Sequence, residues 1–228
     1  MQKRNYQKEL DQIIEKNIAA GIRPKLLVHS CCAPCSSYVM EYLGRYFDLT
    51  MFFYNPNMDS PEEYRKRAEE LQRLIGELNR TEALREHPVR AVIADYDPAA
   101  FEQIAEGHEQ DPERGARCRK CYELRLRRTA EYMLEHNRDC PLESYDYFAT
   151  TLTLSPLKDA EALNLIAEQI AEQLELGYLV SDFKKREGYK RSIELSREYH
   201  LYRQNYCGCR FSRAAAEYQN RQDRTSAG

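Results

Sequence analysis

The chain contains no apolar run close to the length of about 18 residues that a membrane-spanning helix needs. Its opening stretch, MQKRNYQKEL, also lacks the apolar segment of a secretory signal peptide. No internal repeat or low-complexity block stands out along the 228 residues. These absences disfavour a membrane protein, a secreted protein and a repeat array. We therefore expect a cytoplasmic protein without membrane partners.

The composition is typical of a soluble globular protein, because hydrophobic residues make up 42% and charged residues 31% of the chain. We expect one catalytic domain over residues 1–228, with an N-terminal helix within residues 1–21 and a flexible tail over residues 213–228. Eight cysteines would suggest disulfides in a small secreted protein. In a reducing compartment, closely spaced thiols more often bind metal or carry out redox chemistry.

The net charge of -3 conceals an uneven distribution. Residues 111–128 carry +4 and residues 182–213 carry +5, which leaves the remainder near -12. Either basic segment alone is compatible with a solvated helix face. Both segments surround a cysteine pair, however, and positive charge around a reactive site suits a polyanionic substrate. Nucleic acid is the leading candidate.

Apolar periodicity predicts strands that alternate with helices. The expected helices cover residues 6–18, 38–47, 60–78, 118–135 and 159–174, and the expected strands cover residues 25–30, 49–55, 89–95 and 145–153. This alternation is typical of an α/β protein with a parallel sheet and helices on both faces.

Ligands of open parallel sheets bind outside the carboxyl ends of the strands. Four stretches rich in polar or thiol side chains follow the predicted strands: HSCCAPCS, YNPNMDSPEEY, DYDP and TTLTLSPLKD. We therefore expect the chemistry to gather at one edge of the sheet.

Two cysteine groups together offer a soft four-ligand site. Cys31, Cys32 and Cys35 follow the first strand, and Cys118 and Cys121 form a C-x-x-C at the start of a predicted helix. Thiolates from both groups suit zinc or an iron-sulfur cluster. The C-x-x-C taken alone is also compatible with a thioredoxin-like pair, or with two cysteines on one helical turn.

The third group, Cys207 and Cys209, is separated by a single glycine. These thiols can close a strained, easily reduced disulfide or contribute ligands to a second metal, and we favour a redox role. Cys140 precedes a proline away from the other cysteines, and we expect it to be structural.

With these motifs assembled, the chain resembles the cobalamin-independent epoxyqueuosine reductases of the QueH type. The resemblance rests on LLVHSCCAPCSSYVMEYL, FFYNPNMDSPEEYRKR, DYDPAAF, GARCRKCYELRLRRTA, FATTLTLSPLKD and SDFKKREGYKRSIELSREYHLYRQNYCGCRFS. These stretches occur in order and cover most of residues 25–212.

The resemblance implies a Rossmann-like three-layer fold of the nucleotide alpha-hydrolase (HUP) type. It implies reduction of epoxyqueuosine to queuosine in the anticodon loop of tRNA, the last step of queuosine synthesis. It also implies a four-iron, four-sulfur cluster and an additional iron or other divalent metal. Some relatives carry aspartate where this chain has Cys35, which places Cys35 nearer the additional metal.

Removing the epoxide oxygen takes two electrons and two protons, and aliphatic side chains cannot donate electrons. A cluster held by Cys31 or Cys32 with Cys118 and Cys121 can pass single electrons, supplied by an unidentified donor. Cys207 and Cys209 would shuttle electrons or protect the site. Candidate proton donors from the sequence are Tyr96, Asp97 and His29.

Candidate substrate contacts fall into three sets. Asn55, Asn57 and Tyr64 follow the second strand and could contact the base, although asparagine is also ordinary in turns. A polar loop could bind phosphate or sugar, or only cap a helix: Thr150, Thr151, Ser155 and Lys158. Candidate backbone contacts and stacking rings are Arg65, Arg186, Lys190, Arg191, Arg203, Tyr189 and Tyr202.

Three other functions remain open from the residues. One is a metal-free thiol-disulfide oxidoreductase, and another is a zinc-dependent RNA-binding module without catalysis. The third is a sulfur-inserting tRNA enzyme on the same type of fold. Enzymes of that kind bind ATP through an S-G-G-x-D-S loop after the first strand, and HSCCAPCS occupies this place without the glycines. ATP-driven activation is therefore disfavoured.

Overall fold

The computed structural model describes residues 4–226, with the side chains of the last helix described as far as Gln222. Within this range four strands form one sheet in the order β3-β2-β1-β4. The strands are β1 (Lys25–Ser30), β2 (Asp48–Phe53), β3 (Arg90–Ile93) and β4 (Tyr147–Thr150). All three pairings are parallel, so the carboxyl ends of the strands meet at one edge.

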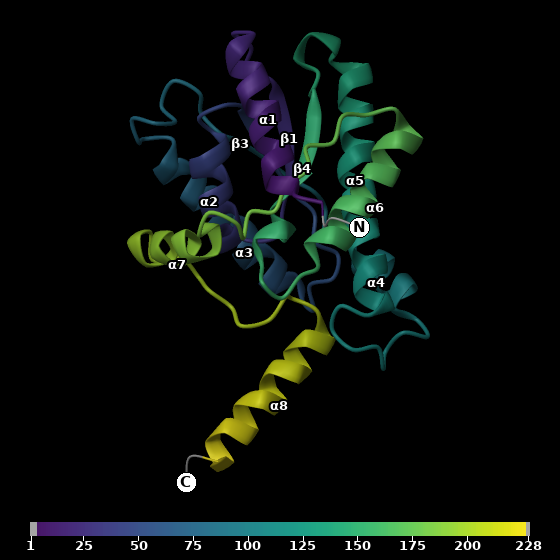
Figure 1. Cartoon of the computed structure of the whole chain (residues 1–228). Coiled ribbons are helices and arrows are strands. Elements are labelled where there is room, and N and C mark those ends of the chain that lie inside the picture. Colours follow the sequence, from purple (N-terminus) through teal and green to yellow (C-terminus); the bar gives the residue numbers. More distant parts are fainter. Residues whose placement is uncertain (1–3, 227–228) are drawn as a thin grey trace.

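The helices connect the strands and cover both faces of the sheet (Figure 1). They are α1 (Tyr6–Ala19), α2 (Ala33–Leu43), α3 (Pro61–Leu78), α4 (Pro98–Ala105), α5 (Ala116–Asp139), α6 (Ala160–Leu174), α7 (Gly188–Glu198) and α8 (Arg210–Ser226), with short 3-10 turns η1 (Pro141–Glu143) and η2 (Thr151–Leu154). Among these described helices, none combines the length and apolar character that crossing a bilayer requires.

Alternating side chains of the central strand divide the core into two layers. Leu26 and Val28 point to one face and pack with α1, α2 and α3. Leu27 points to the other face and packs with α5 and α6. Because both faces of β1 are buried, its sequence is a continuous apolar run rather than an alternating one. The prediction of an α/β, Rossmann-like three-layer fold is confirmed.

Local signals explain where several helices begin. The Ser60 side chain accepts a hydrogen bond from the Glu63 amide at 3.1 Å, and Pro61 occupies the first turn of α3. Asp159 caps α6 in the same way. The helix predicted over residues 38–47 is shifted, because α2 starts directly after Cys32 with Pro34 in its first turn. The first turn of α2 therefore carries Cys35.

The last helix, α8, extends away from the body of the protein (Figure 1). Residues from 213 onward, which we expected to form a flexible tail, continue this helix through Ser226. Helical backbone does not measure mobility, so the flexibility of the segment stays a prediction. The first turns of α8 contribute Ser212, Ala215 and Ala216 to the wall of a cavity described below.

Two glycines are expected to respond to alanine in opposite directions. A Cβ at Gly188, where α7 begins, would overlap the carbonyl oxygen of Phe183 and the ring of Tyr38. Gly188→Ala should therefore lower the free energy of unfolding by about 2–4 kcal/mol. Gly76, inside α3, has open space around its Cβ position, and Gly76→Ala should raise it by about 0.4–1 kcal/mol.

Urea denaturation of both variants beside the wild type measures these changes. Equal stability of Gly188→Ala and wild type would contradict the packing of α7 against α2.

Candidate metal and redox site

A cavity of about 770 Å³ opens at the carboxyl edge of the sheet, between the loops that follow β1 and β4. In the strand order, the chain moves outward from β1 to β3 and then returns to the other side of β1. This is the switch point at which open parallel sheets bind ligands. Four thiols line the cavity: Cys31, Cys32, Cys35 and Cys207.

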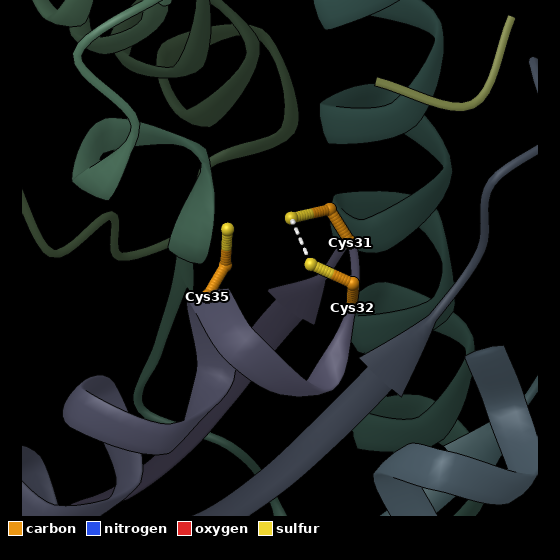
Figure 2. Close-up of side chains that lie close together, drawn as sticks. All are labelled: Cys31, Cys32 and Cys35. Carbon is orange, nitrogen blue, oxygen red and sulfur yellow. Dashed lines mark hydrogen bonds between the residues drawn. The ribbon is translucent and has the colours of Figure 1, made fainter. Parts of the chain in front are cut away.

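The first three thiols converge from the end of β1 and the first turn of α2 (Figure 2). Their Sγ atoms all lie within 4.8 Å of one another, and those of Cys31 and Cys32 are 3.8 Å apart. We call this group the thiol triad. Among the described residues, these three side chains lie close enough together to bind one metal ion.

The thiol triad holds one thiolate more readily than three. Hydrogen bonds from Cys32 and Cys35, together with the Thr151 hydroxyl, hold the pKa of Cys31 well below its usual value. The same contacts with Cys31 raise the pKa of Cys32 to about 12 and that of Cys35 well above its usual value. The first proton therefore leaves Cys31, and a bound cation is needed to displace the other two.

These distances fit a metal. Metal-sulfur bonds of about 2.3 Å place the sulfurs of a tetrahedral thiolate site about 3.8 Å apart. The Cys31–Cys32 distance has this value before any adjustment of the side chains. Three soft thiolates favour zinc, iron or an iron-sulfur centre over magnesium or calcium. The structure thus confirms that a cysteine group at this edge of the sheet has the geometry to hold a metal ion.

The C-x-x-C pair lies on the first turns of α5, which is one of the helices packed on the sheet. Cys118 packs against the same apolar cluster as Cys31, a cluster that includes Tyr122. Cys121 is buried in a second cluster with Phe101 and Cys209. Burial raises the pKa of Cys121, and the charge of Arg125 opposes this effect. The pair thus adjoins both other cysteine groups without lining the cavity itself.

Cys207 and Cys209 face each other across Gly208, with their Sγ atoms 3.5 Å apart. The Ser212 hydroxyl lies 3.0 Å from the Cys207 sulfur, and the Ser212 amide donates to the Cys209 sulfur at 3.4 Å. The Cys209 hydrogen bond and the charge of Lys158 hold the pKa of Cys207 well below its usual value. Both cysteines are free thiols here, and their sulfurs are close enough to form a disulfide bond on oxidation.

Two buried arginines, which sequence reasoning did not single out as site residues, support the thiols. Arg125 is only 2% exposed and donates to the Cys121 carbonyl oxygen at 3.2 Å and to the Asn55 side chain at 3.5 Å. Arg67 pairs with Glu63 at 2.6 Å and donates to the Cys207 carbonyl oxygen at 3.3 Å. In the sequence both arginines resemble the solvated charged residues of a helix surface, because no local pattern distinguishes a buried arginine from an exposed one.

Some predicted substrate contacts line the cavity and others do not. Ser155, Lys158, Arg203 and Tyr189 line it. Asn55 and Asn57 are each 1% exposed and absent from the cavity wall. The Asn55 amide donates to the Ser30 carbonyl oxygen at 2.9 Å, which places it in the support of β1.

The remaining predicted contacts have local partners. Tyr64 is buried and donates to the Ala94 carbonyl oxygen at 2.6 Å. Arg65 and Lys190 form exposed ion pairs with Glu62 and Glu187. Tyr202 donates to Glu63 at 3.1 Å. Their roles toward a substrate stay predictions.

The three predicted proton donors also lie away from the cavity wall. His29 is fully buried between Thr150 and the Tyr54 carbonyl oxygen, and burial lowers its pKa to about 3. Tyr96 donates its hydroxyl to the Met58 carbonyl oxygen at 2.5 Å. Asp97 caps α4 by accepting from the Ala100 amide. A catalytic role for Asp97 stays a prediction.

A parallel α/β sheet with clustered thiols at its switch point defines a class: metal- or thiol-dependent enzymes that bind their substrate at the carboxyl edge of the strands. Comparison with known proteins identifies the family. The family model described as epoxyqueuosine reductase QueH matches residues 26–215. The chain belongs to this family of oxidoreductases.

Curated relatives agree along most of the chain. The protein named epoxyqueuosine reductase QueH from Staphylococcus epidermidis is 41% identical over 213 residues, which cover 92% of this chain and 85% of the relative. The protein of the same name from Streptococcus pyogenes is 39% identical, with coverage of 91% and 78%. The one from Staphylococcus aureus is also 39% identical, with coverage of 92% and 85%. The predicted family is confirmed.

Proposed function

We propose that this protein reduces epoxyqueuosine to queuosine in the anticodon loop of tRNA. The observation that carries the proposal is the thiol triad at the floor of the cavity, in a chain whose relatives are named for this reaction over most of its length. Removing the oxygen of an epoxide takes two electrons, which side chains without sulfur cannot donate. A reductase for it therefore needs sulfur or metal chemistry where the base enters.

The proposed cofactors are a four-iron, four-sulfur cluster and an additional iron or other divalent metal. Cys31, Cys32, Cys118 and Cys121 would hold the cluster, and Cys35 would contact the additional metal together with its triad neighbours. When bound, this group supplies single electrons and a Lewis-acid position for the epoxide oxygen. The low pKa of Cys31 and the buried charge of Arg125 favour the thiolates that such ligation requires.

The cavity suits a nucleotide turned out of an RNA loop. Its volume of about 770 Å³ lies within the usual range of about 300–1,000 Å³ for small-molecule sites. Tyr189 is 37% exposed at the cavity wall and offers a ring on which a base can stack. Arg203 and Ser155 offer a cation and a hydroxyl for phosphate and sugar.

Cys207 and Cys209 would act as a redox pair that returns electrons to the site or protects it. Cys207 faces the cavity, whereas Cys209 packs beside Cys121. The pair therefore lies between the space for substrate and the proposed cluster ligands on α5. An external donor would reduce the disulfide form of the pair.

The test is anaerobic purification with iron and sulfide analysis, followed by assay on tRNA that carries epoxyqueuosine, with dithionite as reductant. We expect bound iron, acid-labile sulfide, and conversion to queuosine detected by mass spectrometry of the digested tRNA. Zinc without iron and without conversion would favour an RNA-binding module instead. Active dithiol exchange in a metal-free protein would favour a thiol-disulfide oxidoreductase.

A further inference from the structure

The departing epoxide oxygen needs a proton donor that can reach it. None of the three donors expected from the sequence, His29, Tyr96 and Asp97, lines the cavity. Each is already engaged with local protein groups. Other side chains of the cavity wall are better placed for this role.

Lys158 lines the same cavity as Cys31 and Cys207. It lies in the loop between η2 and α6, at the carboxyl edge beyond β4, and is partly buried. Its ammonium is 5.8 Å from the centre of the Tyr122 ring. No carboxylate forms an ion pair with it among the residues that the structure describes. An ammonium without a carboxylate partner keeps its protons free to donate to a ligand.

The other charged or acidic groups of the wall are less suited. Arg67, Arg125 and Arg203 are guanidinium groups, which do not release a proton in proteins. Glu113 is exposed. The Tyr206 hydroxyl accepts a hydrogen bond from Arg213 at 2.7 Å, and burial raises its pKa, so it is a neutral phenol without a charge that attracts a polyanionic substrate. Tyr189 is the proposed stacking ring, and the thiols of the wall belong to the proposed metal and redox centre.

We propose that Lys158 is the catalytic residue that protonates the departing epoxide oxygen, an assignment that rests on the proposed function. Two electrons from the reductant of the reaction enter the ring, both carbon-oxygen bonds break, and a carbon-carbon double bond forms. The Lys158 ammonium gives one proton to the oxygen, which leaves as hydroxide and takes its second proton from water. The neutral amine then recovers a proton from solvent, so atoms and charge balance.

The groups that face Lys158 come from three elements. Tyr122 and Arg125 project from α5, Cys207 from the segment between α7 and α8, and Cys31 from the end of β1. Burial is the largest single influence and disfavours the ammonium, but the negative charges of Cys207, Tyr122 and Cys31 together outweigh it, so that the pKa of Lys158 lies above its ordinary value. Lys158 is therefore charged when substrate arrives.

The test uses full-length protein reconstituted anaerobically, with single-turnover rates measured on saturating epoxyqueuosine tRNA in dithionite. Lys158→Met should lower the rate at least about 100-fold, while the tRNA dissociation constant changes less than about 3-fold. Lys158→Arg should be similarly slow, because it keeps the charge without a transferable proton. Added methylammonium should restore part of the rate to Lys158→Ala, an effect that a structural role would not produce.

Lys184→Met is the matched control. Lys184 is also partly buried, donates to the Thr153 carbonyl oxygen of η2 at 3.2 Å and pairs with Asp182, yet it does not line the cavity. Its replacement should leave the rate within about 2-fold.

A wild-type rate in Lys158→Arg would overturn the assignment, because charge alone would then suffice. So would an unchanged rate in Lys158→Met, or a loss confined to tRNA affinity. Iron and sulfide contents equal to wild type verify that each variant carries an intact centre. Failure of the wild type to convert the tRNA would instead refute the proposed function, and this inference with it.

Discussion

Cys31→Ser should remove both the bound metal and the reductase activity. Cys31 has the lowest pKa of the thiol triad and lies 3.8 Å from Cys32, so it is the first thiolate available to a cation. Loss of a direct ligand should exceed the roughly 10–100-fold loss of affinity or activity that follows from removing supporting partners. Iron per chain after anaerobic purification and the conversion of epoxyqueuosine tRNA measure the effect.

Cys140→Ser provides the matched control for this substitution. Cys140 is exposed where α5 ends, outside all three cysteine groups. We expect its metal content and activity to equal those of the wild type. Full iron content and full turnover in Cys31→Ser would show that the thiol triad is not the metal site.

Cys118→Ser should abolish the proposed cluster but leave metal binding at the thiol triad. The thiol triad has the spacing of a single-metal site by itself, whereas a cluster needs further thiolates from α5. We therefore expect Cys118→Ser to lose acid-labile sulfide, visible absorption and turnover. It should still bind one divalent metal at the triad, which cobalt substitution and thiolate-to-metal absorption would detect.

Lys120→Met is the control for the α5 position. Lys120 lies between Cys118 and Cys121 in the sequence, and its side chain is exposed. Its replacement should preserve sulfide and colour, because the charge is solvated. Retention of sulfide and activity in Cys118→Ser would instead mean that the ligands of the cluster come from elsewhere.

The cavity around the thiols is lined by more cationic side chains than carboxylates. Arg125 and Lys158 flank the thiols, and neither forms an ion pair with a carboxylate among the described side chains. Thiolates, or a polyanionic ligand in the cavity, can balance their charges. This arrangement favours anions in the cavity and offers a physical reason for a positively charged wall around a redox centre that acts on RNA.

Several helices show why sequence patterns alone were incomplete. Helix α4 spans only Pro98–Ala105, too short for a clear apolar repeat, and its start is fixed by the Asp97 cap. Helix α7 follows two residues with left-handed backbone, Arg186 and Glu187, which no local signal predicts. It is stabilised by packing on α2, where Gly188 meets Tyr38. Such contacts join residues far apart in the chain.

The site residues divide in the same way. Cysteine spacing grouped Cys31, Cys32 and Cys35 after β1, but only the early start of α2 at Ala33 shows that their three sulfurs converge. The four-thiol site that also includes Cys118 and Cys121 stays a prediction. Asn55 looked like a base contact from its place after β2. In the structure its amide supports the Ser30 carbonyl oxygen, because β2 is central enough for its loop to be covered.

The amino-acid sequence by itself determined the fold class, the family and the three cysteine groups, since these depend on periodicity, short spacings and motifs within single segments. The tertiary structure alone decided which polar groups meet at the thiols. Arg125, Lys158 and Cys207 come from three separate parts of the chain and face one cavity, whereas His29 and Asn57 are enclosed. Burial and orientation are set by long-range packing, and no local pattern contains that information.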